Sequence, residues 1–181
     1  MSRMTGQSGD SVASGKTHIE VDLQSQPVQI APLDWPAQCG AEACFLGRTR
    51  AETHDRFGQL KQLEYQVYVP MALKLLQSIA EQAAQRFGCR RVRIVHAQGA
   101  VPPGDASVVI QVATPHRVQS FEACRFLIDT LKEQLPIWKR QIWEHGETFV
   151  EGWCPDTGQS PAKQSQETNC HGRRRTDRTD L

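Results

Sequence analysis

Residues 114–141, TPHRVQSFEACRFLIDTLKEQLPIWKRQ, form the most informative segment of the chain. Thr114 and Pro115 are typical of a helix N-cap and of the first helical position that follows it. Pro136 ends the predicted helix, because proline cannot continue the helical hydrogen-bond pattern. Between these signals, apolar side chains recur at steps of three and four residues, which predicts one buried helix face. The predicted face consists of Phe121, Cys124, Ile128, Leu131 and Leu135.

Basic side chains stand at both ends of this predicted helix. His116 and Arg117 fall in its first turn, where unpaired backbone N–H groups and the helix dipole favour an anion. Lys132 lies in the last turn, and Lys139 and Arg140 follow soon after the proline. Cations at both ends of one buried helix indicate a binding site for phosphate or carboxylate groups.

The rest of the chain alternates short predicted strands with one further helix. We expect this helix over residues 70–87, because Ala72, Leu76 and Ile79 share one face and Gly88 suits a left-handed stop. Strands are expected at residues 18–23, 41–46, 63–67, 92–97 and 107–113, and a hairpin at residues 142–150. This order predicts an α+β fold with a mainly antiparallel sheet and two principal helices on one side.

Composition shifts at both ends divide the chain into three parts. Residues 1–17 are rich in serine and glycine and are expected to be a disordered tail. Residues 18–153 form the expected folded domain, and residues 154–181 form a second polar tail that we also expect to be disordered. The arginines of this second tail are diluted by Asp177 and Asp180, which favours a solvated tail over a contact with nucleic acid.

The composition also excludes several classes of protein. A net charge of +1 over 181 residues does not suit a general polyanion binder, so a positive site must be local. No apolar run reaches the roughly 20 residues of a membrane span, and the N-terminus lacks a signal peptide's apolar stretch, so we expect a cytoplasmic protein. The six cysteines include no C-x-x-C pair, so we expect no metal site; Cys154, Cys170 and His171 are the alternative ligand set.

The predicted anion site is open to more than one kind of chemistry. A lysine that is desolvated beside other cations can become a nucleophile at neutral pH. Lys132 suits this role because it adjoins the apolar helix face, but a lysine at this position also serves to cap a helix C-terminus. For His116, two roles are similarly possible: it binds an anion, or it is an ordinary histidine at the start of a helix. Glu64 and Asp129 are candidates to orient the basic groups.

Five pieces of the chain form a recognisable series. They are GAEACFLGRTR (residues 40–50), LEYQVYVPMALKLL (residues 63–76), PPGD (residues 102–105), HRVQSFEACRFLIDTLKEQLPIWKR (residues 116–140) and FVEG (residues 149–152). Each piece is weak alone, but the order of HR, a helix, LK and P-x-W-K-R is specific. Together the pieces resemble the molybdopterin synthase catalytic (large) subunit family.

This resemblance implies an α/β hammerhead-like fold, a homodimer and a sulfurtransferase without a cofactor. In the family, each large subunit binds a small ubiquitin-like sulfur-carrier subunit, which gives a heterotetramer. The carrier's C-terminal Gly-Gly thiocarboxylate supplies sulfur to cyclic pyranopterin monophosphate, and this yields the dithiolene of molybdopterin. Carried over by position, Lys132 and Lys139 resemble the catalytic lysines. The expected substrate-binding residues are Phe45, Arg48, Thr49, Arg50, His116, Arg117, Arg140 and Gln141.

The chain departs from the family pattern at three places. Thr49 stands where valine is common, Gly152-Trp153 stand where a basic residue is frequent, and the connection over residues 31–39 is shorter. These differences affect the outer wall of the expected pocket. The main alternative function is a non-catalytic module that binds a ubiquitin-like protein, and the presence of both Lys132 and Lys139 favours the enzyme. An RNA-binding α+β domain is a further alternative, but the chain lacks its aromatic strand motif.

Overall fold

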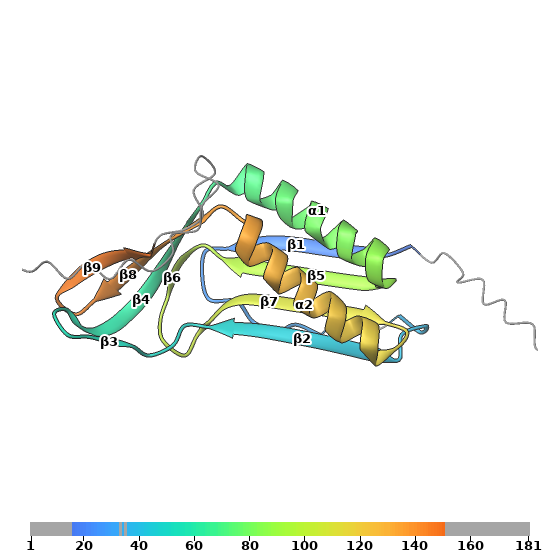
Figure 1. Ribbon diagram of the computed structural model, residues 1–181, viewed down its shortest axis with the longest axis horizontal. Coiled ribbons are helices and arrows are strands. Elements are labelled where there is room, and N and C mark those ends of the chain that lie inside the picture. Colours follow the sequence, from blue (N-terminus) through green and yellow to red (C-terminus); the bar gives the residue numbers. More distant parts are fainter. Residues whose placement is uncertain (1–15, 33, 35, 151–181) are drawn as a thin grey trace, which may run out of the picture.

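The computed structural model describes residues 16–150, except residues 33 and 35, and in it two helices run across a sheet (Figure 1). The helices are α1 (Val69–Phe87) and α2 (Arg117–Gln134). The strands are β1 (His18–Gln24), β2 (Ala41–Arg48), β3 (Thr53–His54), β4 (Gly58–Val67), β5 (Arg91–Ala97), β6 (Gly99–Val101), β7 (Ala106–Thr114), β8 (Ile137–Trp143) and β9 (Gly146–Val150). Apart from residues 16 and 17, the two predicted tails lie outside the described residues.

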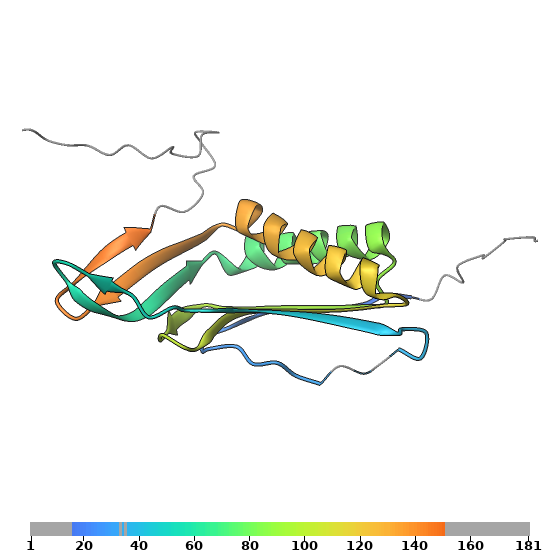
Figure 2. The same ribbon diagram turned by 60° about the horizontal axis from the view of Figure 1, so that its bottom comes forward.

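The sheet beneath the helices contains four strands in the order β1-β5-β7-β2. β7 is antiparallel to both β5 and β2, whereas β1 is parallel to β5. Both helices lie on one face of this sheet, as the sequence predicts (Figure 2). Side chains from the two layers, including Leu76, Ile94 and Leu127, meet in an apolar core where they are fully buried.

α1 confirms its predicted start and stop. Pro70 lies at its first residues, where the missing N–H group has no helical partner to lose. Gly88 ends the helix with a φ of +66°, a left-handed conformation that glycine adopts at no steric cost. Ala72, Leu76 and Ile79 form the predicted buried face and are fully enclosed.

The start of α2 differs from the prediction. Thr114 is the last residue of β7, where it pairs with Ala41, and His116 is the N-cap in an extended conformation. The Thr114 hydroxyl donates a hydrogen bond of 2.7 Å to the carbonyl oxygen of His116 and therefore caps no helical N–H group. The prediction was wrong because strand pairing extends through the residue that the local sequence marks as a cap.

Four of the five residues predicted for the buried face of α2 are buried, namely Cys124, Ile128, Leu131 and Leu135, and the fifth is not. Phe121 was expected on it but is 68% exposed. The fully buried positions are Ala123 and Leu127, and Ser120 is nearly so. Successive helical residues are about 100° apart, so Phe121 lies a quarter turn away from Ser120 and points to solvent.

A second sheet contains the strands β3-β4-β8-β9, and β6 also pairs with β4. It extends beyond the ends of the two helices (Figure 1). The predicted closing hairpin is present, but its first strand begins at Ile137, directly after Pro136, instead of at residue 142. Lys139 therefore lies on β8, opposite Tyr65 of β4. The segment between the strands expected at residues 41–46 and 63–67 contains the short strand β3, which was not predicted from the sequence.

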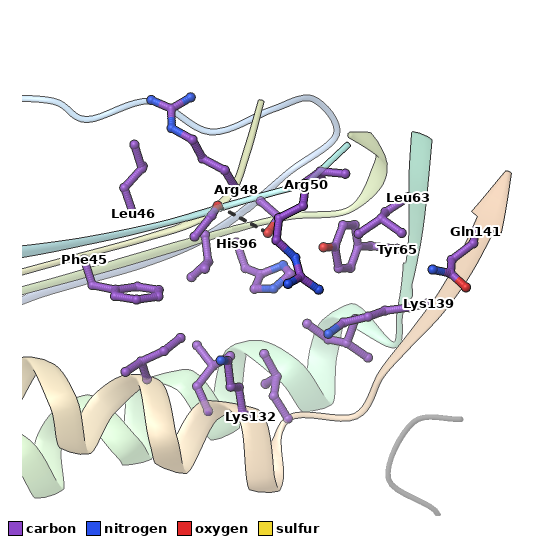
Figure 3. A pocket seen from close by; sticks show the side chains of 18 of the residues that line it. Phe45, Leu46, Arg48, Arg50, Leu63, Tyr65, His96, Lys132, Lys139 and Gln141 are labelled. Carbon is purple, nitrogen blue, oxygen red and sulfur yellow. Dashed lines mark hydrogen bonds between the residues drawn. The ribbon is translucent and has the colours of Figure 1, made fainter. Parts of the chain in front are cut away.

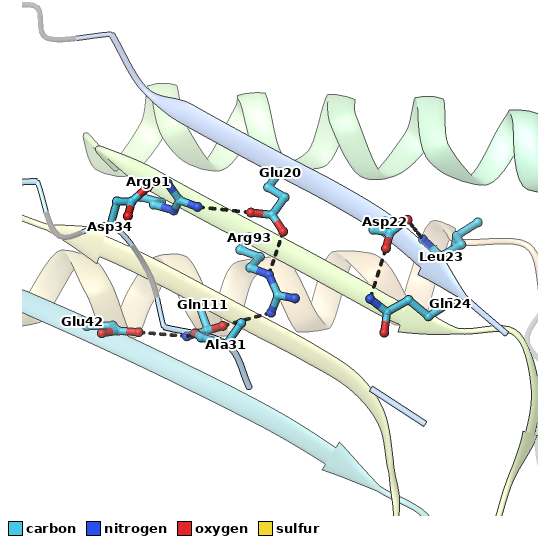
Figure 4. Close-up of polar contacts among 10 residues, drawn as sticks. All are labelled: Glu20, Asp22, Leu23, Gln24, Ala31, Asp34, Glu42, Arg91, Arg93 and Gln111. Atoms are coloured by element: carbon cyan, nitrogen blue, oxygen red, sulfur yellow. Dashed lines mark hydrogen bonds and ion pairs between the residues drawn. The ribbon is translucent and has the colours of Figure 1, made fainter. Parts of the chain in front are cut away.

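Polar side chains form a cluster on the sheet face that is opposite to the helices (Figure 4). Glu20 accepts hydrogen bonds from Arg91 at 3.1 Å and from Arg93 at 2.9 Å, and both arginines are buried. Arg93 also donates to the side-chain oxygen of Gln111 at 3.1 Å. Gln111 in turn donates to the Ala31 carbonyl oxygen at 3.0 Å, so the cluster attaches the connection between β1 and β2 to the sheet.

Substitution of Glu20 tests how much this cluster stabilises the fold. Glu20→Gln removes the carboxylate that both buried guanidinium groups share and, among the described residues, leaves Arg91 only its long contact of 3.8 Å with the exposed Asp34, which is costly because a buried charge needs a partner. The Glu20 side chain keeps 41% of its exposure, so solvent screening reduces the effect. We expect the free energy of unfolding, measured by urea denaturation, to fall by about 1–3 kcal/mol.

Asp22→Asn is the matched control for this substitution. It makes the same change in charge on the same strand, but Asp22 is exposed, and among the described residues its side chain accepts hydrogen bonds from its near neighbours Leu23 and Gln24. We expect it to change the free energy of unfolding by less than about 0.5 kcal/mol. Equal effects of the two substitutions would show that the buried arginines do not depend on Glu20.

Candidate functional site

A pocket of about 840 Å³ lies where the C-terminal ends of β2 and α2 meet the second sheet (Figure 3). We call it the lysine pocket. Most of the residues that the sequence assigns to the site line it. These residues are Phe45, Arg48, Thr49, Arg50, Lys132, Lys139 and Gln141.

The two lysines reach the pocket from different elements. Lys132 occupies the last turn of α2, as the sequence predicts. The chain then leaves the helix at Leu135, whose N–H group still donates to the Leu131 carbonyl oxygen at 3.0 Å, and turns at Pro136 into β8. This short turn directs the chain back past the end of the helix, so that the side chain of Lys139 points into the space between the end of α2 and the strands, on the same side as Lys132 (Figure 3).

Lys139 is the desolvated lysine of the pair. Burial lowers its pKa, and the positive charge of Lys132 lowers it further. Its Nζ atom lies 5.9 Å from the ring centroid of Tyr65. The sequence suggested Lys132 for the desolvated role, but Lys132 is exposed because the last helical turn ends at the mouth of the pocket. A partly buried lysine beside a second cation is the arrangement that increases the neutral fraction of an amine.

The backbone near Arg48 is held by the turn over residues 102–105. The Arg48 guanidinium donates to the Gly104 carbonyl oxygen at 2.6 Å, and the Gly104 N–H group donates to the Thr49 carbonyl oxygen at 2.8 Å. Thr49 is only 3% exposed, whereas the Arg50 side chain is 85% exposed and pairs with Glu52 at 2.9 Å. Arg50 thus stands at the rim of the pocket with its charge accessible.

Gly47 gives the pocket its width at this end. A Cβ atom at this position would lie 2.7 Å from a methyl carbon of Val108 and 3.2 Å from the ring of Phe45. No side chain fits without displacing one of these neighbours. The lone glycine of the FLGR sequence, weak evidence by itself, is therefore a steric requirement of the pocket wall.

Arg140 does not line the pocket, contrary to the prediction. Side chains alternate along a strand, so Arg140 points away from the face that Lys139 and Gln141 share. It forms ion pairs with Glu64 on β4 and with Glu147 on β9, the latter at 3.0 Å. The prediction was wrong because it placed Arg140 after a helix end and not on a strand. Glu64 does orient a basic group, as expected, but on the outer face.

His116 and Arg117 also lie away from the lysine pocket. Both are at the N-terminal end of α2, and Arg117 is about 22 Å from Lys132 along the helix axis at 1.5 Å per residue. Within one chain, the predicted basic residues therefore lie in two separate places, the lysine pocket and the N-terminal end of α2. Asp129, the other candidate to orient basic groups, pairs with Arg125 at 3.4 Å on the exposed side of α2.

Uncharged polar residues that the sequence did not single out form one wall of the pocket. His96 and Tyr65 are 4% and 5% exposed, and their rings meet edge to face at 5.2 Å. Burial lowers the pKa of His96 to about 4 and raises that of Tyr65, and it outweighs the opposing effect of Ser107 and Thr49 on Tyr65. His96 was missed because it stands among Val92, Ile94, Val95 and Ala97 in the strand RVRIVHA, where a histidine is more typical of a core residue.

Two further sequence expectations can be compared with the described residues. Among them, no group of three or more His, Cys, Asp or Glu side chains is placed to hold a metal ion. The alternative ligands Cys154, Cys170 and His171 lie outside the described range. No helix in the described part of the chain is long and apolar enough to cross a membrane.

Comparison with known proteins gives one consistent result. The family model described as MoaE protein matches residues 17–134. The molybdopterin synthase catalytic subunit of Arabidopsis thaliana is 40% identical over 142 residues, which are 77% of this chain and 71% of the plant protein. The human protein of the same name is 37% identical over 131 residues, which cover 72% of this chain and 65% of the human protein.

Solved structures agree with the sequence matches. The crystal structure of molybdopterin synthase from Staphylococcus aureus superposes with a TM-score of 0.63 at 31% identity, over 73% of this chain and 96% of that chain. A complex of subunits 1 and 2 of the molybdopterin-converting factor from Helicobacter pylori superposes with a TM-score of 0.57 over 72% of this chain and 90% of that chain; at 17% identity this likeness concerns the fold. The chain belongs to the MoaE family of molybdopterin synthase catalytic subunits, which are sulfurtransferases.

Proposed function

We propose that the lysine pocket is the place where sulfur passes from the thiocarboxylated C-terminus of a small carrier subunit to cyclic pyranopterin monophosphate. The observation that carries the proposal is the convergence of Lys132 and the desolvated Lys139 in one pocket of a MoaE-family chain. A surface that only bound a partner would not need a desolvated lysine, because desolvating a charge costs free energy. We expect the reaction to take place in the cytoplasm and to involve neither nucleic acid nor a membrane.

The pocket residues divide into two roles in this proposal. Both the thiocarboxylate and the phosphate are anions, and the exposed charges of Lys132 and Arg50 at the rim suit them. Lys139 has a lowered pKa and so carries a larger neutral fraction near pH 7. A neutral amine in this position suits the transfer of a proton or the uptake of the carrier's acyl group.

The carrier is proposed to be a small ubiquitin-like protein whose Gly-Gly tail enters the pocket. The Helicobacter pylori relative is a complex of two subunits of the molybdopterin-converting factor, which supports a subunit partner for this chain too. An extended tail that ends in two glycines presents little beyond its backbone, so it can enter a channel that bulkier residues would block. Gly47 and its close neighbours Phe45 and Val108 suit such a narrow approach.

A homodimer is part of the proposal because one chain leaves its basic residues in two places. His116 and Arg117 lie about 22 Å along α2 from Lys132, too far to contact the same small substrate. A second copy of the chain, related by two-fold symmetry, would place its helix N-terminus at the pocket of the first. The two residues would then bind the substrate phosphate, and two carriers on the dimer would give a heterotetramer.

Replacement of the pocket lysines tests the proposed site. Lys132→Ala and Lys139→Ala are each expected to lower the rate of molybdopterin formation by about 100-fold or more, because a positioned acid or base contributes at least that much. The assay combines the protein with a thiocarboxylated carrier and cyclic pyranopterin monophosphate. Lys61→Ala is the control, since Lys61 pairs with Glu144 outside the pocket and its loss should leave the rate unchanged. Normal rates in both pocket variants would remove the lysines from the mechanism.

The electrostatic link between the two lysines predicts a shift with a definite sign. The charge of Lys132 lowers the pKa of Lys139, so Lys132→Ala should raise the pKa of Lys139 toward its ordinary value. Only the neutral amine reacts with an acylating reagent, so the acylation of Lys139 should require a higher pH in the variant. Mass spectrometry of the modified peptide measures this pH dependence. Lys74, exposed on α1, is the reference and should react identically in both proteins; an unshifted Lys139 would contradict the link.

Mixing two inactive variants tests the proposed dimer. Lys132→Ala and Arg117→Ala proteins should each be impaired alone. If Arg117 acts on the pocket of the other copy, a mixed dimer contains one pocket with neither substitution. Random exchange of subunits should then restore up to about a quarter of the wild-type activity. An absence of recovery after verified exchange would place Arg117 outside the partner's pocket.

A further inference from the structure

The imidazole ring of His96 lines the lysine pocket but has no part in the chemistry assigned to the lysines. It lies on β5, between the strands and the C-terminal end of α2, beside Tyr65 (Figure 3). Its Nδ1 atom is 2.7 Å from the carbonyl oxygen of Ala97. A carbonyl oxygen only accepts hydrogen bonds, so Nδ1 carries the proton and donates it. In the neutral ring, Nε2 is therefore an acceptor with a free lone pair.

This lone pair has no partner within the part of the chain that the structure describes. The bond to Ala97 is the one hydrogen bond of the His96 ring among those residues. Lys139 acts on His96 through its charge alone, and burial keeps the ring neutral, since the pKa is lowered to about 4. Nε2 is not among the fully buried side-chain atoms that lack a partner in the described residues, so it is accessible from the pocket, and a bound ligand can donate a hydrogen bond to it.

The charged groups around the pocket cannot replace this acceptor. Arg50, Lys132 and Lys139 only donate hydrogen bonds, and they suit anions. Two other acceptors in the lining have partners: Glu52 pairs with Arg50 at 2.9 Å, and the Gln141 side-chain oxygen accepts from Thr148 at 3.0 Å. The hydroxyl oxygen of Thr49 has no partner among the described residues, but it is fully buried and so closed to a ligand. The pocket thus has a cationic side for a phosphate and a neutral wall that can accept from an uncharged N–H or O–H group.

We propose that His96 is a specificity-determining residue whose Nε2 atom accepts a hydrogen bond from an N–H or O–H group on the uncharged ring system of the substrate. This inference rests on the proposed function, because it places a ring that carries both such donors and a phosphate in the lysine pocket. The cationic side chains of the pocket bind the phosphate, and His96 binds the part of the ring system that carries the N–H or O–H group. Inorganic phosphate is also an anion but lacks the ring system of the substrate, so it should bind to the cationic side chains and not to His96.

Two substitutions separate the acceptor from the bulk of the side chain. His96→Leu fills a similar volume without an acceptor, whereas His96→Gln keeps an oxygen near the position of Nε2. Both remove the imidazole Nδ1 donor to Ala97, and glutamine differs from leucine by its amide, which supplies an acceptor oxygen together with an NH2 group. By titration calorimetry, His96→Leu should bind cyclic pyranopterin monophosphate about tenfold more weakly than wild type, about 1.4 kcal/mol, and His96→Gln should recover most of the loss. All three proteins should bind inorganic phosphate equally.

The outcomes distinguish the inference from the function on which it rests. Wild-type protein that neither binds nor converts cyclic pyranopterin monophosphate overturns the proposed function. Wild-type binding that is unchanged in His96→Leu, or equally weak in both variants, overturns the role of His96 alone. Nitrogen-15 NMR of the wild-type protein gives an independent reading if a variant fails to fold. The Nε2 resonance of His96 should move upfield when the substrate is added but stay in place with inorganic phosphate; an unmoved resonance with bound substrate also overturns the role.

Discussion

β5 and β7 are covered on both faces, and every residue on them is buried, so no polar side chain on these strands can depend on water. The helices cover one face with apolar side chains. The other face carries Arg91, Arg93 and Gln111. Both arginines donate to Glu20, Arg93 also donates to Gln111, and Gln111 donates to the connection from β1 to β2. Because buried polar groups must be paired, these contacts determine where that connection lies. His96, near the end of β5, is the residue of this strand that lines the lysine pocket.

The position of Lys139 in the pocket results from the short turn after α2 and from the alternating directions of side chains along β8. Leu135 and Pro136 leave no room for a loop, so β8 begins at once and returns past the end of α2. Alternation then sends Lys139 inward, where burial and the charge of Lys132 lower its pKa, and sends Arg140 outward to its carboxylate partners. Two adjacent basic residues thereby obtain opposite environments: Lys139 lines the pocket, and Arg140 lies on the outer face of the sheet.

Much of this arrangement could be predicted from the sequence. The features that could not be predicted all depend on contacts between residues far apart in the chain. Period and capping residues predicted α1 and the C-terminal end of α2, with Lys132 in its last turn, because these signals act within a few residues. The N-cap at His116, the outward direction of Arg140 and the role of His96 depend on strand pairing with distant residues. Local propensity carries no information about such partners, so these positions required the fold. The resemblance supplied the family, but not the place of each residue within one chain.

The ion pairs of Arg140 have a consequence on the far side of the sheet. Arg140 links Glu64 on β4 to Glu147 on β9 and so crosses three neighbouring strands, while Lys139 stands on the opposite face of the same backbone. Glu147 keeps 49% of its side-chain exposure, so dissolved ions screen this link. Ionic strength can therefore act on the stiffness of the wall that carries Lys139 without any ion entering the pocket. The ion pairs that support the strand of Lys139 thus lie on the outside of the molecule, where dissolved salt reaches them.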